Sequence, residues 1–302
     1  MKIAVIGSGA MGSLYGGYLS QNNEVYLIDT DSTKVDTINK NGIKIKEQDK
    51  EVMFYPKALV DSSKIGEADL IILFVKSLFS KVALTNNQSL IGENTYVLTL
   101  QNGSGHEEII KKFVSKDHII IGTTQHNASV IESNYVNHGG SGKTNIGMIV
   151  KQDNQLLQIK ESFESCGFHT QICEDIQKII WDKLFTNVSA SVLTGVLQVK
   201  LGFLLDNEHG LFLVKQLVKE AVAVANGDGM NFDEQEVFGK VKEVLVNVHE
   251  GYTSIYADIR DKRMTEVETI SGYVVRASKR NGVPAPSHKF IVELVHALEE
   301  KK

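Results

Sequence analysis

The stretch KIAVIGSGAMGSLYGGYLS, residues 2–20, decides the fold of the amino-terminal half. A short β-branched run leads directly into a G-x-G-x-x-G segment, and a helical pattern follows it. In such a unit the first glycine permits a tight turn, the second lets backbone amides approach a pyrophosphate, and the third lets helix and strand pack closely. The stretch therefore predicts a dinucleotide-binding fold of the Rossmann type. Its cofactor-binding residues are Gly7, Ser8, Gly9, Ala10, Met11 and Gly12.

An acidic residue closes the next strand-like run, EVYLID, at Asp29. A carboxylate about twenty residues after the glycines accepts hydrogen bonds from the adenosine ribose. Asp29 and Asp31 would repel a 2′-phosphate, and the segment IDTDSTK has no arginine to receive one, although Lys34 could reach it. Locally, these residues favour NAD(H) over NADP(H).

Strand-like and helical patterns divide the chain into two parts. Strand-like runs alternate with helical patterns in the first half: KIAVIG, EVYLID, LIILFV, TYVLTL and HIIIGT. The polar, glycine-rich residues 123–149 predict antiparallel edge strands or loops, and HTQICE is a last strand. From residue 175 on, apolar residues recur at three and four, as in helices. We expect an α/β fold with a doubly wound Rossmann-type sheet over 1–174 and an all-helical substrate domain over 175–302.

The composition excludes several classes of function. The chain has 302 residues and a net charge of −5, without a basic cluster of the kind that binds nucleic acid or an anionic membrane. No apolar run approaches the roughly 20 residues of a membrane span, and the start leads straight into a strand pattern without a leader. With only two cysteines, we expect a cytosolic protein with reduced thiols that acts on a small molecule.

A polar line runs along the helical stretch WDKLFTNVSAS, residues 181–191. Lys183, Asn187 and Ser191 are spaced by four, so on an α-helix they share one stripe. Such a stripe is more often a solvated face than a site. In a dehydrogenase, however, Lys183 is a candidate general acid that protonates the developing alkoxide, and Asn187 is a neutral partner that orients the substrate or the lysine.

A carboxylate near the other end of the chain is a second candidate. Thr265 and Glu268 have capping-box spacing, which predicts a helix start with Glu266 in its first turn, although helix-end electrostatics explain Glu266 equally well. Ser254 could present a hydroxyl to a substrate carboxylate, or lie on an exposed helical face. The later helices carry Leu213, Leu217 and Val224, which suit either a core or a homodimer interface.

Two loops follow strands of the first half directly. They place Lys76 in FVKS and Asn102 in LQNG at the carboxyl edge of the sheet, where ligands bind, although the Asn-Gly pair is also a common turn. His126 and His138 are isolated, with no acid or cysteine at ligand spacing. We interpret them as loop histidines and expect no metal site.

With these residues in hand, the chain resembles the ketopantoate reductase family over essentially its whole length. The matching pieces are IGSGAMG, VK at Lys76, QNG at Asn102, WDKLFTN, and SIYADIRDKRMTEVETISG. The resemblance implies NADPH-dependent reduction of ketopantoate to D-pantoate, for pantothenate synthesis. It also implies that Lys76 and Asn102 lie beside the nicotinamide end of the cofactor.

The same resemblance implies roles for the helical part. Lys183 would be the general acid and Glu266 its carboxylate partner, holding the substrate hydroxyl. Asn187 and Ser254 would bind substrate. The family usually has a second asparagine where this chain has Ser191, whose shorter side chain would leave a roomier or wetter pocket.

Other functions stay open beside ketopantoate reduction. Ser191, Asp29 and Asp31 also suit an NAD-dependent D-2-hydroxyacid dehydrogenase that acts on branched or aromatic 2-oxo acids. A β-hydroxyacid dehydrogenase also carries lysine and asparagine on a helix, but its glycine-rich substrate segment is not found in this sequence. A nicotinamide-sensing module without turnover is a more distant alternative. The lysine, asparagine and glutamate argue against it, because a sensor needs no proton donor.

Overall fold

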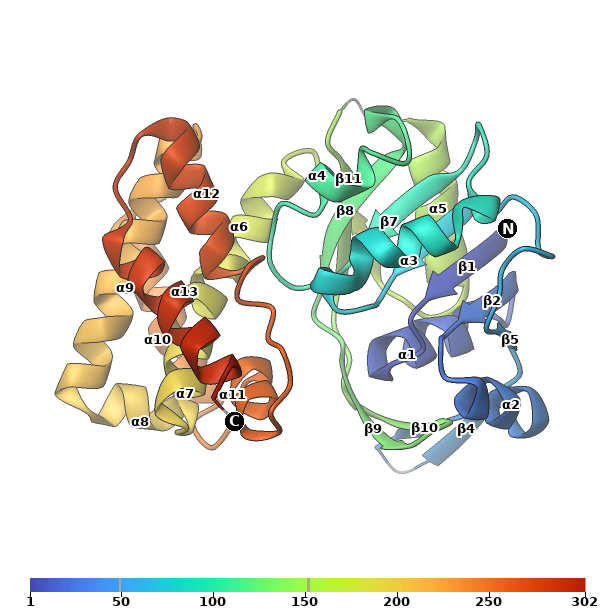
Figure 1. Cartoon of the computed structure of the whole chain (residues 1–302), viewed down its shortest axis with the longest axis horizontal. Helices are drawn as coiled ribbons and strands as arrows, with labels where there is room; N and C mark the ends of the chain where they lie inside the picture. The colour runs from blue at the N-terminus through green and yellow to red at the C-terminus, as the bar shows by residue number, and fades with distance from the viewer. Residues whose placement is uncertain (49, 151–152, 302) are drawn as a thin grey trace. The chain divides into compact units, whose positions relative to one another are not determined.

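The computed structural model describes residues 1–48, 50–150 and 153–301. The chain forms two compact units, shown from blue to red along the chain in Figure 1. The first comprises Met1–Gln101 and His106–Gln177, and the second comprises Asn102–Gly105 and Lys178–Lys302. The short loop Asn102–Gly105 thus belongs to the carboxyl-terminal unit.

The first unit is built on a mostly parallel sheet of order β12-β11-β8-β7-β6-β1-β2-β5. Its central strands are buried along nearly their whole length, as expected of a parallel sheet covered on both faces. Strand β11 pairs antiparallel with β8 and parallel with β12, so these two strands at one edge run opposite to the others. The strands are β1 (Lys2–Ile6), β2 (Glu24–Ile28), β5 (Lys57–Leu59), β6 (Leu70–Leu73), β7 (Tyr96–Thr99), β8 (Ile119–Thr124), β11 (Thr144–Met148) and β12 (Thr170–Ile172).

The strand order reverses beside β1, because the chain goes from β1 through β2 to β5 on one side and then from β6 through β7 to β8 on the other. Such a reversal is the point where doubly wound sheets bind ligands. The α/β fold class predicted from the sequence is confirmed. The helices of this unit are α1 (Ala10–Leu19), α2 (Ser32–Asn41), α3 (Ser80–Asn86), α4 (Glu107–Ile110) and α5 (Asn154–Ser165).

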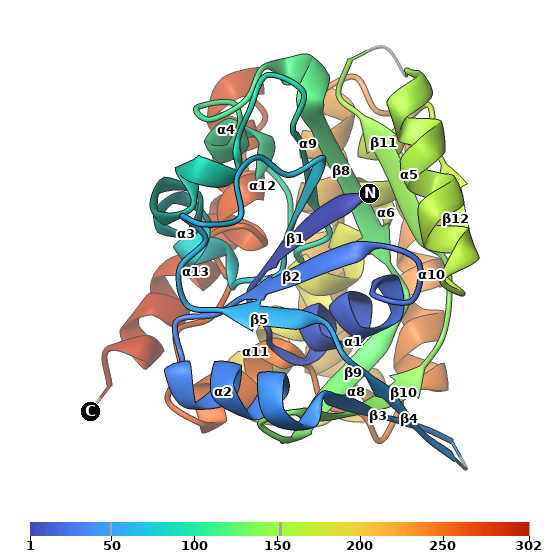
Figure 2. The same ribbon diagram turned by 90° about the vertical axis from the view of Figure 1, so that its right-hand side faces the viewer.

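A smaller sheet of order β4-β3-β10-β9 packs against α1, as Figure 2 shows. Its strands are β3 (Ile43–Glu47), β4 (Lys50–Phe54), β9 (Asn127–Glu132) and β10 (Tyr135–Gly140). The sequence predicted antiparallel edge strands or loops between residues 123 and 149, and the structure has the strands β9, β10 and β11 there. The β3–β4 hairpin was not predicted, although the alternation in IKIKE is a strand signal.

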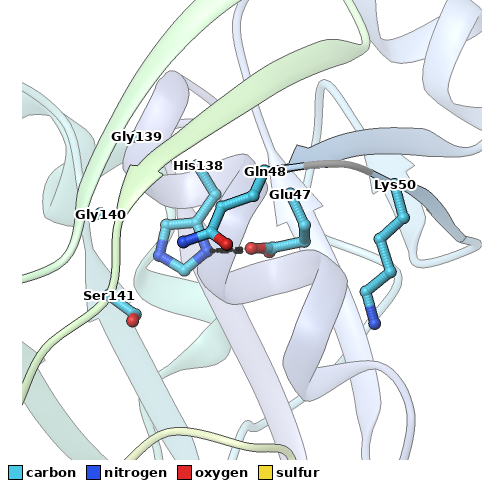
Figure 3. Close-up of a pocket in the computed structure, with 7 residues that line it drawn as sticks. All are labelled: Glu47, Gln48, Lys50, His138, Gly139, Gly140 and Ser141. Carbon is cyan, nitrogen blue, oxygen red and sulfur yellow. Dashed lines mark hydrogen bonds and ion pairs between the residues drawn. The ribbon is translucent and has the colours of Figure 1, made fainter.

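His126 lies in the loop between β8 and β9, as predicted, but the prediction that His138 is a loop residue and that the two histidines are isolated is wrong. His138 lies on β10, and its Nε2 is 3.0 Å from His126 Nδ1. Its other ring nitrogen bonds Glu47 at 2.8 Å, and Glu47 also accepts from Tyr18 on α1. Figure 3 shows Glu47 and His138 at a pocket of about 350 Å³ in the small sheet. The network joins β3, β10 and α1. Its residues are far apart in the sequence, so the sequence did not indicate that they meet.

The second unit is helical and is built around its own core. Trp181, Leu184 and Phe185 from the predicted WDKLFTN helix are almost fully buried in it. Its helices are α6 (Ile176–Thr186), α7 (Val192–Leu197), α8 (Leu201–Asp206), α9 (Glu208–Gly227), α10 (Glu234–Asn247), α11 (Ser254–Arg260), α12 (Ser271–Asn281) and α13 (Pro286–Glu299). A π-helical turn, Asn187–Ser191, lies between α6 and α7.

The long helix α9 provides core residues on one face. Leu217 and Val224 are 3% and 0% exposed and belong to the core, whereas Leu213 is 41% exposed.

Within the described part of the chain, no helix is both long enough and apolar enough to cross a membrane.

A buried carboxylate holds α13 against α9. Glu220 accepts from the Ser287 amide at 2.9 Å and from the Ser287 hydroxyl at 2.6 Å. These groups lie in the first turn of α13, where the helix dipole favours a negative charge. His288, next in the chain, is fully buried, and its Nε2 donates to the Leu217 carbonyl at 2.9 Å. Pro286 is at the first position of the helix, where its missing N–H costs nothing.

Acid should destabilise this fold through the buried His288 and the half-buried His126. Burial lowers the pKa of His126 and of His288 from 6.5 to about 4, and the nearby Glu220 offsets this only in part for His288. Between these pH values the unfolded chain binds the protons that the folded chain excludes. The free energy of unfolding therefore falls as pH drops from about 6.5 to about 4, by up to about 1.4 kcal/mol per pH unit for each histidine.

Urea unfolding measured across this pH range tests the effect. His288→Gln can retain a donor to the Leu217 carbonyl without a titrating ring. The slope of its free energy of unfolding against pH should therefore be smaller than that of the wild type by the equivalent of about one proton. His209→Gln, at an exposed histidine, is the control and should keep the wild-type slope. An unchanged slope in His288→Gln would contradict the prediction.

Candidate active site

The glycine-rich loop of the first unit has the geometry that a bound pyrophosphate needs. Gly7 has φ +97°, which side chains rarely adopt, and a Cβ on Gly12 would lie 1.8 Å from the Gly7 carbonyl oxygen. A Cβ on Gly9, by contrast, would meet nothing within 4 Å. Gly9 is the N-cap of α1 and offers no side-chain cap to its amides. The residues therefore fit a dinucleotide phosphate over the start of α1.

Asp29 faces the same loop from the end of β2. Its Oδ2 accepts from the Ser8 amide at 2.9 Å and from the Ser8 hydroxyl at 2.6 Å, and its Oδ1 accepts from the Asp31 amide. Lys34 Nζ is 3.8 Å away. Burial raises the pKa of Asp29, but these hydrogen bonds and Lys34 outweigh it, so the pKa lies below its ordinary value. The carboxylate is charged at neutral pH.

Lys76, the other predicted cofactor residue of this unit, follows β6 across Phe74 and Val75. It is half-buried and begins a short 3₁₀ turn, with its carbonyl accepting from the Phe79 amide at 2.8 Å. Ala10 and Met11 form the first turn of α1 and are half-buried. These residues lie where the sequence placed them.

The polar line Lys183, Asn187 and Ser191 runs from α6 into the π-helical turn. The regular α-helix assumed from the sequence is therefore wrong at Asn187–Ser191, where the turn is wider. The side chains still meet, with Ser191 Oγ 3.4 Å from Asn187 Oδ1. Ser191 is only 6% exposed, and Thr194 beyond it is fully buried. Burial argues against a plain solvated face, and π-helical turns often occur at functional sites.

Lys183 is the half-buried cation of this site. Burial lowers its pKa below the ordinary 10.5, and the charge of Glu266 opposes that shift. The carboxylate of Glu266 thus acts electrostatically on the ammonium of Lys183. An ammonium whose pKa lies below its ordinary value gives up its proton more readily than a solvated lysine does.

Glu266 is not in a helix, contrary to the prediction. Helix α12 begins at Ser271, with Ile270 as its N-cap. Glu268, predicted to close a capping box with Thr265, instead binds Arg276 at 2.9 Å and His296 at 3.0 Å. Thr265 is held by Glu299, which accepts from its amide at 2.7 Å. Glu266 therefore lies in an irregular turn before the helix, and hydrogen bonds to other elements position it.

Ser254 is the exposed first residue of α11, and its neighbour Thr253 caps that helix. The Thr253 and Thr194 hydroxyls are 2.9 Å apart, which joins α11 to α7. Close packing at Gly195 strengthens this joint, because a Cβ there would lie 2.4 Å from Ile255 Cγ2. Ser254 is thus fixed to the helix that follows Ser191.

Asn102 lies in the second unit, in the loop Asn102–Gly105. Its carbonyl accepts from the Thr269 hydroxyl at 3.2 Å, and the Thr269 carbonyl accepts from the Ser104 amide at 2.8 Å. The loop is therefore bonded to the turn that carries Glu266. Sequence analysis missed Thr269, because nothing in VETISG distinguishes its hydroxyl from that of a solvated threonine.

The comparisons with known proteins identify the family of the chain. Family models described as Ketopantoate reductase PanE/ApbA and its C-terminal part match residues 3–151 and 175–299. A 2-dehydropantoate 2-reductase from Pyrococcus horikoshii is 32% identical over 99% of this chain and 98% of that protein. One from Lactococcus lactis subsp. lactis is 31% identical with the same coverage.

A solved structure is also similar over the full length. The ternary structure of D-mandelate dehydrogenase with NADH and anilino(oxo)acetate has a TM-score of 0.92 at 33% identity. The match covers 99% of this chain and 98% of that one.

Removing the Glu266 charge should make Lys183 less basic. In Glu266→Gln the opposing charge is lost, so the Lys183 pKa should fall further below its ordinary value and the neutral amine should appear at lower pH. Acetic anhydride labelling of Lys183 across pH, read by peptide mass spectrometry, measures this midpoint without any substrate.

The exposed Glu268→Gln is the matched control, and its midpoint should stay at the wild-type value. Identical labelling profiles for Glu266→Gln and the wild type would show that the two groups are not coupled.

Proposed function

The chain belongs to the ketopantoate reductase family, and from that premise we propose that it reduces ketopantoate to D-pantoate in pantothenate biosynthesis, as a 2-dehydropantoate 2-reductase. The observation that carries the proposal is the half-buried Lys183, whose lowered pKa the charge of Glu266 opposes. The substrate is a small 2-oxo acid, and we propose a cytosolic enzyme. Turnover that depends on Lys183 would exclude a sensing module.

The reaction adds a hydride and a proton across the 2-oxo group. When bound, the nicotinamide supplies the hydride to the carbonyl carbon. Lys183 Nζ gives its proton to the carbonyl oxygen as negative charge develops there, and it regains a proton from solvent afterwards. The charge of Glu266 raises the pKa of Lys183 against the lowering effect of burial, so the lysine is still protonated when the proton is transferred. Glu266 also holds the substrate hydroxyl.

Neutral groups orient the substrate in this proposal. Asn187 and Ser191, which contact each other on the π-helical turn, bind the substrate beside Lys183. Ser254 offers an exposed hydroxyl to the substrate carboxylate. Asn102, in the loop bonded to the Glu266 turn, serves substrate or nicotinamide.

The cofactor is a nicotinamide dinucleotide, held by the loop from Gly7 to Gly12, and we propose that NADH is preferred over NADPH. The Asp29 carboxylate is charged and fixed by Ser8, so a 2′-phosphate beside it would be repelled. Lys34 already lies near that carboxylate and offsets only part of this charge. Lys76 serves the nicotinamide end.

A second candidate is an NAD-dependent D-2-hydroxyacid dehydrogenase for branched or aromatic 2-oxo acids. Ser191 favours it, because a serine fills less space than the asparagine usual in the family. The likeness to D-mandelate dehydrogenase, solved with NADH and anilino(oxo)acetate, points the same way. Parallel assays with ketopantoate, 2-oxoisovalerate and phenylglyoxylate separate the two candidates. Faster turnover of ketopantoate supports the first, and faster turnover of the other acids replaces it with the second.

Replacing the general acid tests the proposed chemistry. Lys183→Ala should lower kcat by at least about 100-fold, the usual scale for loss of a proton donor, while NADH binding by fluorescence titration survives. Lys240→Ala removes an exposed lysine that pairs with Asp182, and it should retain wild-type turnover. Near-normal turnover in Lys183→Ala would mean that the polar line does not serve proton transfer.

Replacing Asp29 tests the cofactor preference. We expect kcat/KM with NADH to exceed that with NADPH by about tenfold or more, equivalent to about 1.4 kcal/mol. Asp29→Ala should narrow that ratio, because it removes the repelling charge. Asp36→Ala, an exposed acid on α2, is the control. A wild-type preference for NADPH, or a ratio that Asp29→Ala leaves unchanged, would contradict the assignment.

A further inference from the structure

We propose that Thr269 is a positioning residue of the active site, whose hydroxyl ties the Asn102 loop to the turn that carries Glu266. The proposal rests on the function proposed above and extends it to a residue outside the groups assigned there to substrate and cofactor. It concerns only contacts within the carboxyl-terminal unit, to which all three residues belong.

The contacts of Thr269 converge from two segments far apart in the sequence. Its Oγ1 is 3.2 Å from the Asn102 carbonyl oxygen and 3.2 Å from the Glu266 carbonyl oxygen. A hydroxyl has one proton to donate, so it is shared between these two acceptors. The Thr269 amide also donates to the Glu266 carbonyl at 3.1 Å. Thr269 thus closes the turn and attaches it to the loop at once.

The backbone of the Asn102 loop is shaped for this contact. Gly103 has φ +95°, and a Cβ there would lie 2.3 Å from the Thr269 carbonyl oxygen. The Ser104 amide reaches the same carbonyl at 2.8 Å because the glycine allows so close an approach. The Asn102 loop and the Glu266 turn therefore fit closely against each other, and the Thr269 side chain adds a further hydrogen bond between them.

Glu266 depends on such contacts because no helix holds it. The turn begins after Thr265, whose amide is bound by Glu299, and ends where α12 starts at Ser271. Between these points the Glu266 carbonyl is bonded by the amides of Thr269 and Ile270 and by the Thr269 hydroxyl. The hydroxyl also reaches the Asn102 carbonyl. Its loss should let the Glu266 turn and the Asn102 loop shift relative to each other and to Lys183.

The test compares Thr269→Val, which keeps the β-branched shape without the hydroxyl, with Thr269→Ser, which keeps the hydroxyl. Activity of the general acid requires the protonated Lys183, so kcat falls as pH rises through its pKa. If Glu266 moves away, that pKa falls, and the alkaline limb of kcat moves to lower pH. We expect Thr269→Val to lower kcat about tenfold, with a smaller change in KM and a limb shifted to lower pH.

Thr269→Ser should restore both kcat and the limb to within about threefold and a few tenths of a pH unit of the wild type. Thr85→Val removes a comparable hydroxyl-to-carbonyl bond from α3 and is the control for threonine replacement. A Thr269→Val enzyme with wild-type kcat and an unmoved limb overturns the proposal. So does a serine variant as impaired as the valine variant.

A second measurement separates this proposal from the proposed function. Acetic anhydride labelling of Lys183 needs no substrate, so it reports the coupling to Glu266 even if none of the 2-oxo acids is reduced. Absence of turnover in the wild type would refute the function alone. A labelling midpoint that moves to lower pH in Thr269→Val but not in Thr269→Ser supports the positioning role, and equal midpoints in all three proteins refute it.

Discussion

The account depends on one electrostatic constraint, an ammonium at Lys183 that burial destabilises and a carboxylate at Glu266 that partly compensates. A buried charge without a partner is costly, so the rest of the helical unit must keep the two groups close. Helix α6 and the π-helical turn present the lysine, and the bonded turn before α12 presents the glutamate. The charge of Glu266 keeps the lysine protonated. Burial leaves the pKa of the lysine below its ordinary value, which makes it a weaker base and a better proton donor.

The two units meet different physical demands. The first provides rigid backbone features, a positive-φ glycine, an uncapped helix start and a fixed carboxylate at Asp29, all set by a strand pattern that the sequence shows openly. The second places side chains that are 83 residues apart along the chain, Lys183 and Glu266, so its site exists only through tertiary contacts. The residues that recognise the dinucleotide are therefore close together in the sequence, whereas the residues proposed for the chemistry are far apart.

This difference explains which features could be predicted from the sequence. The glycine-rich loop, Asp29 and the central strands follow from short-range periodicity and turn chemistry, and the structure has them. The capping box at Thr265 failed because Glu299 and Arg276 compete for the groups it needs. The histidine pair and Thr269 were not predicted for a related reason. Their partners, Glu47 and the Asn102 carbonyl, lie in distant segments, which a single sequence does not reveal.

The alkaline limb of kcat for the wild-type enzyme, measured with saturating NADH and ketopantoate between about pH 7 and pH 11, tests the central claim most directly. The account predicts the loss of one proton with an apparent pKa below the 10.5 of an ordinary lysine. It also predicts that the residual activity of Lys183→Arg lacks this limb, because arginine stays protonated throughout. A kcat that stays constant to pH 11, or a limb that persists in Lys183→Arg, would contradict the assignment of Lys183 as the proton donor.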